Sequence, residues 1–299
     1  MFDTTPILDC AGRRLELDRP RIMGIVNVTP DSFSDGGQHI DPEAAVAHAL
    51  RLVEEGADLL DIGGESTRPG AEAVDAATEL ARVIPVLERL VQQVQVPVAV
   101  DTSKPEVMRA AIAAGAHMIN DVNALRADGA LDAVAGSGVA VCLMHMQGAP
   151  RTMQDAPQYD DVVADVHRFL AERIFACEMA GIAKRSLVVD PGFGFGKTVE
   201  HNYRLLRQLA RFADLGVPVL AGLSRKSMIG AVTGLPVDQR VVGSAVAAVL
   251  AAGQGARILR VHDVAATREA LAVWTAYDAQ PAPAPGKAAA PTLRWPDDD

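Results

Sequence analysis

Polar side chains that can hold a planar heterocycle occur where several short apolar runs of this sequence end. Asp101 follows the run VPVAV, Asn120 lies in HMINDV, and Asp190 follows LVV. Together with Lys226, they offer hydrogen-bond acceptors and donors of the kind that grip the edge of a ring bearing amide and amine groups. The sequence therefore predicts a pocket for a heterocyclic ligand.

A second group of residues has the chemistry of an anion site. Arg68, Arg260 and His262 suit a phosphate group, and Asn27 adds an amide oxygen at the end of another apolar run. A heterocycle held beside a diphosphate suggests displacement at a carbon that bears a diphosphate leaving group. The expected metal is Mg²⁺, because amide and phosphate oxygens are hard ligands and the sequence has no cluster of soft ligands.

Other polar residues near the same positions have plainer interpretations. Asp61 and Asp121 are expected mainly to fix loops or to pair with a neighbouring arginine or lysine, and His145 to be a satisfied histidine at the edge of the core. Lys104 and Lys197 are equally well interpreted as solvated surface charges or as site residues. We therefore leave these five residues out of the predicted site.

The apolar runs that precede these residues read as buried parallel strands, since they are nearly continuous rather than alternating. The expected strands are 22–28, 59–62, 96–100, 117–122, 139–144, 187–189, 217–223 and 257–261. Helical patterns lie between and after them, at 42–55, 75–93, 105–114, 130–136, 160–180, 199–210, 238–252 and 263–277.

Eight strand–helix units over about 250 residues predict an α/β fold, a single-domain (β/α)8 TIM barrel. An open doubly wound sheet would bind its ligand at one switch point, whereas here polar residues follow almost every strand. We expect an N-terminal extension at 1–20, the catalytic domain at 21–278, and a disordered Pro/Ala-rich tail at 279–299.

Composition limits the partners. The net charge of −10 and the pI near 5.2 argue against a nucleic-acid or anionic-membrane surface. The three cysteines are odd in number and lack metal-ligand spacing, which indicates a reduced, cytoplasmic setting. No apolar stretch approaches about 18 residues, and no signal pattern opens the chain, so we expect a soluble protein.

Seven motifs strengthen these expectations, because over residues 21–275 they make the sequence similar to the bacterial dihydropteroate synthases of folate biosynthesis. The motifs are NVTPDSFSDGG at 27–37, DIGGESTRPGA at 61–71, DTSK at 101–104, IND at 119–121, DPGFGFGK at 190–197, SRK at 224–226 and RVHDV at 260–264. The resemblance implies condensation of 6-hydroxymethyl-7,8-dihydropterin diphosphate with para-aminobenzoate by an SN1-like displacement.

The resemblance also implies site residues, position by position. The pterin contacts are Asp101, Asn120, Asp190, Lys226 and Arg260, and the Mg²⁺ ligand is Asn27. The diphosphate contacts are Thr67, Arg260 and His262, with Asn27 a further candidate. The para-aminobenzoate pocket, where sulfonamides compete, is Phe33, Thr67, Arg68, Pro69, Phe195, Lys226 and Ser227, and Ser227 is expected to begin a helix. Asp101, Lys226, Arg260 and His262 are the expected catalytic residues.

Two alternatives remain at this point. A pterin-binding methyltransferase would share the barrel and some pterin contacts, and a non-catalytic paralogue would only bind pterin. The motifs DSFSDGG and STRPG, together with SRK, speak against the methyltransferase, because methyl transfer needs no diphosphate or benzoate site. The residues Asn27, Arg68, Lys226 and His262 speak against the paralogue, because a binding protein has no use for leaving-group residues. The family resemblance further implies a homodimer through outer helices, for which the small, apolar helix 238–252 is the candidate.

Overall fold

The computed structural model of the chain describes residues 6–29, 41–66, 74–148, 153–154 and 156–279. Four predicted site residues, Phe33, Thr67, Arg68 and Pro69, lie outside these ranges, as do residues 280–299 of the expected tail. None of the helices in the described ranges combines the length and apolar character needed to cross a bilayer.

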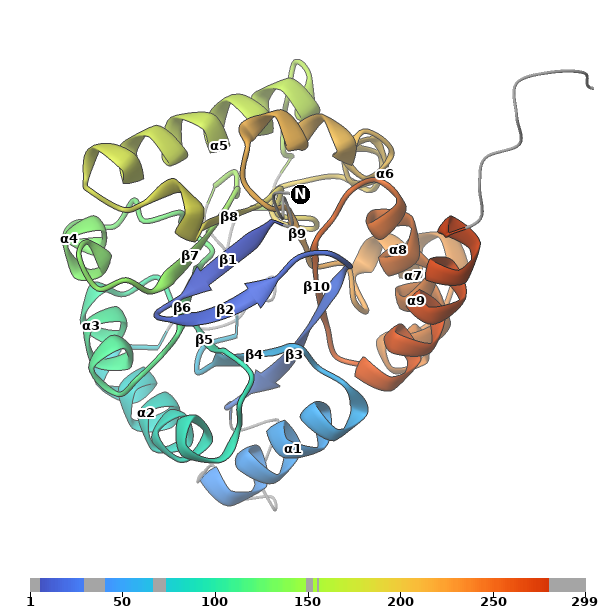
Figure 1. Cartoon of the computed structure of the whole chain (residues 1–299). Helices are drawn as coiled ribbons and strands as arrows, with labels where there is room; N and C mark the ends of the chain where they lie inside the picture. The colour runs from blue at the N-terminus through green and yellow to red at the C-terminus, as the bar shows by residue number, and fades with distance from the viewer. Residues whose placement is uncertain (1–5, 30–40, 67–73, 149–152, 155, 280–299) are drawn as a thin grey trace, which may run out of the picture.

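Eight parallel strands form the barrel, as predicted, in the order β8-β7-β6-β5-β4-β3-β10-β9 (Figure 1). They are β3 (Arg21–Asn27), β4 (Leu59–Gly63), β5 (Val98–Asp101), β6 (Met118–Asp121), β7 (Ala140–Met144), β8 (Leu187–Asp190), β9 (Leu220–Ala221) and β10 (Ile258–Val261). A single parallel bridge, between Val189 and Val219, joins β8 to β9 and brings the two ends of the sheet together. Strand β9 is much shorter than the expected 217–223 and pairs with β10 over two residues only.

The outer layer consists of helices that follow the strands. They are α1 (Pro42–Glu55), α2 (Ala76–Gln93), α3 (Pro105–Ala113), α4 (Ala130–Val134), α5 (Val162–Met179), α6 (Val199–Arg207), α7 (Ser227–Thr233), α8 (Val241–Gly253) and α9 (Val264–Asp278), with short 3-10 helices η1 (Lys184–Ser186), η2 (Leu209–Leu215) and η3 (Val237–Gln239). Helix α1 shows how local chemistry sets the bounds. The Asp41 carboxylate accepts a hydrogen bond from the Glu43 amide at 2.9 Å, Pro42 takes the first turn, and Gly56 ends the helix at φ 106°.

An antiparallel hairpin that the sequence analysis did not predict closes the amino-terminal end of the barrel. Strands β1 (Ile7–Cys10) and β2 (Arg13–Glu16) are joined by Ala11 and Gly12, both at positive φ, as a two-residue hairpin turn requires. Leu8, Leu15 and other hairpin side chains form one buried cluster with inward-facing residues of the barrel strands. Figure 1 shows this hairpin in front of the barrel opening, so this end of the barrel is a packed core.

Candidate active site

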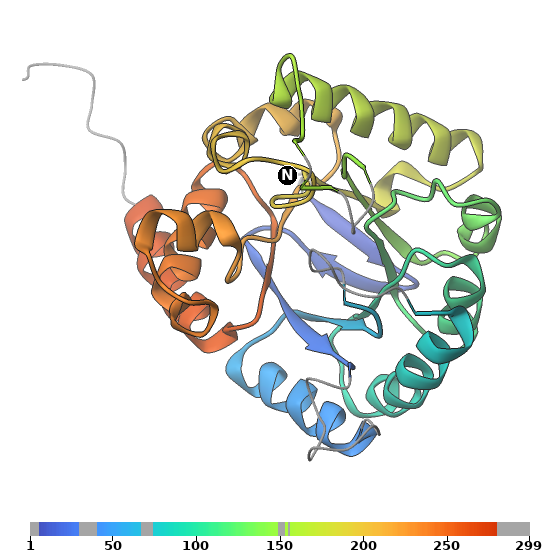
Figure 2. The ribbon, with the colours of Figure 1, turned by 180° about the vertical axis from the view of Figure 1, so that it is seen from behind.

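The end of the barrel opposite the hairpin faces the viewer in Figure 2. Predicted polar residues lie at the carboxyl ends of the strands. Strand register sets their neighbours: Asn27 pairs with Gly63, Gly63 with Asp101, and Asp101 with Asn120. Adjacent carboxyl ends in a closed parallel sheet face one opening. Asn27, Asp101 and Asn120 are therefore brought to one side of the mouth.

Arg260 of β10 lies at the centre of a charged network. Its Nε donates to Asp61 Oδ2 at 2.5 Å, and its Nη2 donates to Asp101 Oδ2 at 2.8 Å. Asn120 Nδ2 donates to the same Asp61 oxygen at 3.0 Å. Arg260 is thus held by carboxylates from two other strands.

Two glycines leave space beside these side chains. A Cβ atom placed on Gly63 would lie 3.9 Å from Asn27 Oδ1 and 4.0 Å from Asp101 Oδ2. A Cβ atom on Gly222 would lie 3.9 Å from both Asp190 Oδ2 and Lys226 Nζ. The same point is 3.8 Å from Arg260 Cβ, so the bare Gly222 backbone borders a small space that three predicted pterin contacts share.

Burial controls the proton affinities in this region. Desolvation raises the pKa of Asp101 to about 7, although the charge of Arg260 opposes the rise. Desolvation likewise raises the pKa of Asp190, against the attraction of Lys226. It lowers the pKa of Lys226 to about 8, against the attraction of Asp190. Asp101 and Lys226 therefore have pKa values close to neutral pH, and such shifted pKa values are concentrated at functional sites.

The loop after β8 provides an apolar wall for the site. Lys226 Nζ donates to the Phe193 carbonyl and lies 4.7 Å from the centroid of the Phe195 ring. Phe195 is half-buried, and Ser227 is exposed at the start of α7, where the sequence analysis expected a helix to begin. The structure thus brings Phe195, Lys226 and Ser227 to the same part of the mouth.

Lys197 holds this loop from within, and its interpretation as a solvated surface charge was wrong. The side chain is buried, and its Nζ donates to the carbonyls of Gly192 and Phe195 at 2.9 and 3.0 Å. It also lies 2.9 Å from Nδ1 of the buried His145. The pKa of Lys197 is driven well below its usual range by desolvation. Gly192 has φ 71° and no room for a Cβ beside the His145 carbonyl, so the tight loop requires glycine there.

His262 lies at the end of β10, next to the strand end of β9. Its Nδ1 is 2.9 Å from Ser224 Oγ, and its backbone N–H donates to the same oxygen at 3.2 Å. Arg225, at φ 58°, directs its guanidinium away from this pair and onto the Asp263 carboxylate at 2.5 and 2.9 Å. The serine therefore sets the orientation of the His262 ring.

Two of the residues left out of the predicted site fix loops or secondary structure. Asp121 accepts hydrogen bonds from the Asn123 and Leu125 amides, which confirms its expected loop-fixing role. Lys104 is no free surface charge, since it donates to Glu65 and, at 2.6 Å, to the buried Glu79 of α2. Glu79 was missed; its position among the buried, apolar residues of the α2 stripe was the available signal.

Asp61 is the principal correction to the predicted site. It was left out because it was expected to fix a loop or to pair with a neighbouring arginine or lysine. It does pair with an arginine, but that arginine is the predicted site residue Arg260, and the other contact of Asp61 is the predicted site residue Asn120. Within the described residues its second oxygen, Oδ1, has no hydrogen-bond partner. Its position as a charged residue within the apolar run LLDI, which forms a fully buried strand, was the sequence signal.

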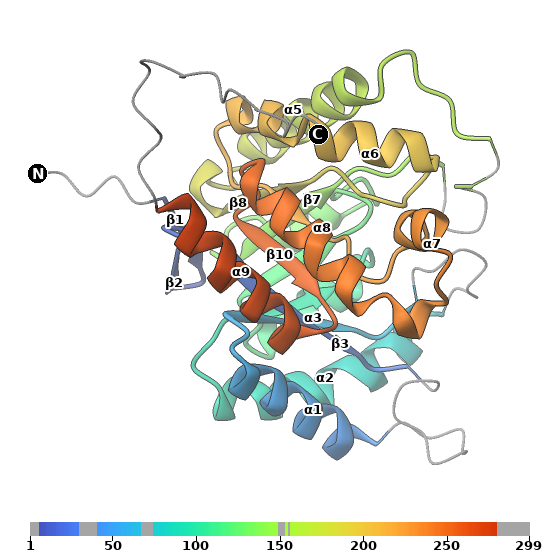
Figure 3. The ribbon, with the colours of Figure 1, turned by 90° about the vertical axis from the view of Figure 1, so that its right-hand side faces the viewer.

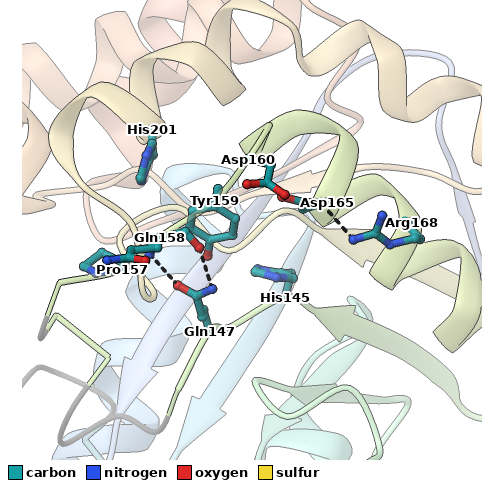
Figure 4. Close-up of a pocket in the computed structure, with 9 residues that line it drawn as sticks. All are labelled: His145, Gln147, Pro157, Gln158, Tyr159, Asp160, Asp165, Arg168 and His201. Atoms are coloured by element: carbon teal, nitrogen blue, oxygen red, sulfur yellow. Dashed lines mark hydrogen bonds and ion pairs between the residues drawn. The ribbon is translucent and has the colours of Figure 1, made fainter.

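A separate cavity of about 700 Å³ opens between the loop before α5 and the start of α6 (Figure 4). Its walls include His145, Tyr159, Arg168 and His201, and a Gln147 side chain that pairs with the Gln158 backbone. It contains none of the predicted site residues. His145 is its link to the mouth, and desolvation lowers the pKa of that imidazole to about 2, so it is neutral.

The donor set limits the kind of metal that fits. The described residues contain no group of three or more histidine, cysteine, aspartate or glutamate side chains arranged to hold an ion. Asn27 Oδ1 beside Asp101 offers a hard oxygen at the mouth. Such a sparse set suits Mg²⁺, which retains water and binds substrate phosphates in addition to one or two protein oxygens.

Comparison with known proteins gives a consistent result. The sequence pattern of the pterin binding enzymes matches residues 23–262. Dihydropteroate synthase of Escherichia coli K12 is 55% identical over 262 residues, which cover 88% of this chain and 93% of that protein. Dihydropteroate synthase of Xanthomonas albilineans, solved with 4-aminobenzoic acid, is 69% identical with a TM-score of 0.88, covering 93% of this chain and all of that one. The X. albilineans complex with 7,8-dihydropteroate gives 66% identity and a TM-score of 0.84, covering 92% of this chain and all of that one.

Proposed function

This chain belongs to the dihydropteroate synthases of the pterin-binding enzyme family, and we propose that the groups at its barrel mouth carry out the family reaction. The enzyme condenses 6-hydroxymethyl-7,8-dihydropterin diphosphate with para-aminobenzoate to give 7,8-dihydropteroate and diphosphate in folate biosynthesis. The observation that carries the assignment to this mouth is the Arg260 network with Asp61 and Asp101, opposite Asp190 and Lys226.

The pterin ring fits the space beside Gly222. Asp190 and Asn120 offer acceptors for the amine and amide edge of the ring, and Lys226 offers a donor. Arg260 packs beside the ring, because its Nε and Nη2 are already engaged by Asp61 and Asp101. The X. albilineans relative was solved in complex with 7,8-dihydropteroate, which supports a pterin site in this chain.

The diphosphate is expected next to the ring, near Asn27, Arg260 and His262. Thr67, outside the described residues, would add a hydroxyl. Asn27 would hold Mg²⁺, which when bound supplies positive charge that weakens the bond to the leaving group. Arg260 and the His262 ring, which Ser224 orients, would stabilise the negative charge that develops on the diphosphate as it departs.

An SN1-like course follows from the chemistry of the substrate. The electron-rich dihydropterin can delocalise the cation left when diphosphate departs, and the ionised Asp101 carboxylate would stabilise it. Para-aminobenzoate is neutral at its amine near pH 7, so it attacks without a strong base and loses its proton afterwards. Phe195, Lys226 and Ser227 would form the inner part of the para-aminobenzoate pocket, with Phe33, Arg68 and Pro69 completing it; the X. albilineans complex with 4-aminobenzoic acid supports such a pocket.

A single-turnover assay tests the proposal. Purified protein is mixed with dihydropterin diphosphate, Mg²⁺ and para-aminobenzoate, and diphosphate and dihydropteroate are followed together. We expect both in equal amounts. Diphosphate alone would mean that water captures the cation and that the benzoate site is wrongly assigned. Neither product, with pterin still bound, would instead indicate a binding protein.

We further propose that the enzyme is a homodimer through α8 and α9. Val242, Val246 and Leu250 of α8 are 75%, 53% and 53% exposed, and Val273 and Tyr277 of α9 are exposed as well. Figure 3 shows these two helices side by side on one face of the barrel, and a contiguous apolar face of this kind is typical of subunit contacts.

Substitution of Val246 by Asp tests the dimer. A charge buried at a symmetric contact is present twice, so we expect the variant to sediment as a monomer at concentrations where the parent protein is a dimer. Phe175→Asp, which places the same charge at an exposed apolar position of α5, is the matched control and should leave the sedimentation unchanged. A dimeric Val246→Asp variant would exclude this interface.

Finally, we propose that the enzyme works in the cytoplasm. Cys10, Cys142 and Cys177 are free and buried. Desolvation raises the pKa of all three thiols, which keeps them protonated and unreactive. Free cysteines are usual in a reducing compartment. Fractionation of the source cells with antibody detection would place the protein directly.

A further inference from the structure

The Asp61 carboxylate contacts two residues of the proposed pterin site and has no described contact with its own loop. It is completely buried in the middle of β4, and Oδ2 accepts from Arg260 Nε at 2.5 Å and from Asn120 Nδ2 at 3.0 Å. Removing a carboxylate from water costs several kcal/mol unless a charge and hydrogen bonds compensate. Fixing a loop does not require a fully buried carboxylate, so the desolvation cost of Asp61 points to a role for its contacts with Asn120 and Arg260.

The contact with Asn120 fixes the polarity of that side chain. An ionised carboxylate only accepts hydrogen bonds, so the amide nitrogen of Asn120 must point toward Asp61. The carbonyl oxygen of the same amide then lies on the other side, where it can accept from an N–H of the ligand. Without Asp61, the two ends of the Asn120 amide are interchangeable.

The contact with Arg260 fixes the plane of the guanidinium. Asp61 binds Nε and Asp101 binds Nη2, so two separate carboxylates hold two different nitrogens of the planar group. Nη1 makes no hydrogen bond to any residue in the described part of the chain and remains available to substrate. Asp101 alone would hold one nitrogen and leave the group free to pivot.

We infer that Asp61 is a positioning residue for the pterin diphosphate: it sets the donor and acceptor pattern that Asn120 and Arg260 present to this substrate. The inference rests on the proposed function and deepens it, because it assigns a role in substrate selection to a residue that acts through the two side chains it holds. Para-aminobenzoate, which is recognised by other residues, should be unaffected.

Steady-state kinetics of Asp61→Asn test this assignment. The variant keeps the shape of the side chain but replaces one acceptor by a donor. We expect KM for the pterin diphosphate to rise roughly 10- to 100-fold, the range for loss of a charge-assisted hydrogen bond, with KM for para-aminobenzoate unchanged. A folded variant with a normal pterin diphosphate KM, or with both KM values raised equally, would overturn the inference.

Asp58→Asn is the matched control. Asp58 precedes the same strand, β4, at the opposite end of the barrel, and its carboxylate binds Arg19, Arg21 and the Ile22 amide. This substitution also removes a carboxylate from an arginine network, so it reports the general cost of such a loss. We expect unchanged KM values for both substrates; a raised pterin diphosphate KM in this control would show that the effect is not specific to Asp61.

Side-chain NMR of the ligand-free wild type provides a second test that does not depend on turnover or on the folding of a variant. We expect the Arg260 Nε–H to exchange with water at least about tenfold more slowly than that of Arg168, whose side chain is 69% exposed. Equal exchange rates would refute the positioning role. Slow exchange in a protein that forms no dihydropteroate would instead count against the proposed function alone.

Discussion

At the scale of single residues, the position of Asp101 determines both its charge and its task. Burial raises its pKa to about 7, so the carboxylate is only partly ionised at neutral pH. Since the ionised form is the one that would stabilise a pterin cation, kcat/KM should rise with pH through this value. An acid with a raised pKa ionises only at a higher pH, so we expect activity to fall as the pH drops below about 7.

Asp101→Asn tests this interpretation. The amide keeps the shape but never carries the charge, so we expect kcat/KM to fall by roughly 10²–10³ and the rise near pH 7 to disappear. The measurement is a pH profile of kcat/KM between about pH 5.5 and 8.5 for both proteins. Turnover close to that of the wild type, or the same pH-dependent rise in the variant, would contradict the assigned role.

Residue types and strand-end positions predicted that Asp190 and Lys226 lie close together at the mouth, but they left Asp61 out. They did not reveal how those side chains pair. Arg260 forms an ion pair with Asp61, 199 residues earlier in the chain, because the strand order of the barrel places β10 beside β3 and close to β4. Asp61 and Asp121 look equivalent in the sequence, since each is the last but one residue of an apolar run, and only the contacts of the side chain separate them.

At the scale of elements, the loop after β8 is ordered by one buried amine. Lys197 donates to two carbonyls of this loop, and the same loop carries Phe195 and the Phe193 carbonyl that binds Lys226. Lys197→Met leaves those carbonyls without their donor. We expect a loss of roughly 1–3 kcal/mol in the free energy of unfolding, and faster hydrogen exchange over residues 192–197.

The measurements for Lys197→Met are urea unfolding and native-state hydrogen exchange with peptide-level resolution. Lys184→Met, at an exposed lysine of η1, is the control and should change neither quantity appreciably. Unaltered exchange in the loop of the Lys197 variant would show that the glycine-rich backbone holds its shape without the amine.

Sequence periodicity predicted the bounds of helices and strands well where buried residues recur regularly. It predicted them less well where contacts with distant parts of the chain set the bounds. Helices α1 and α5 carry clear caps and stripes, and they begin and end within two residues of the expected bounds. The hairpin β1–β2 escaped prediction because its two strands have four residues each and alternate only partly, and their partner surface is the barrel interior. Strand β9 is shorter than expected, since it pairs with β10 over two residues and the chain meets β8 only at the bridge of Val219 with Val189.

At the scale of the whole molecule, the two ends of the barrel divide stability from chemistry. Leu8 of the hairpin is completely buried at the amino-terminal end, in a cluster without any predicted site residue. Leu8→Ala should therefore lower the free energy of unfolding by about 2–5 kcal/mol, as cavity-forming leucine substitutions do, with kcat and both KM values unchanged at temperatures where the variant is folded.

Denaturant unfolding and steady-state kinetics of the same preparation test this division. Met179→Ala, at a methionine that is 72% exposed on α5, serves as the control for loss of an apolar side chain and should alter stability by less than about 0.5 kcal/mol. A Leu8→Ala enzyme with altered KM values would show that packing at the closed end is transmitted to the mouth.

The single bridge between β8 and β9 also makes the substrate part of the architecture. Asp190 ends β8, and Lys226 follows β9, so a ring that binds both side chains spans the least hydrogen-bonded joint of the barrel. The bound pterin would connect β8 to the segment after β9 through its hydrogen bonds to Asp190 and Lys226, where the backbone supplies a single bridge. The ligand-free and pterin-bound enzymes would then differ in rigidity where β8 meets β9, and the other strands of the barrel would be unchanged.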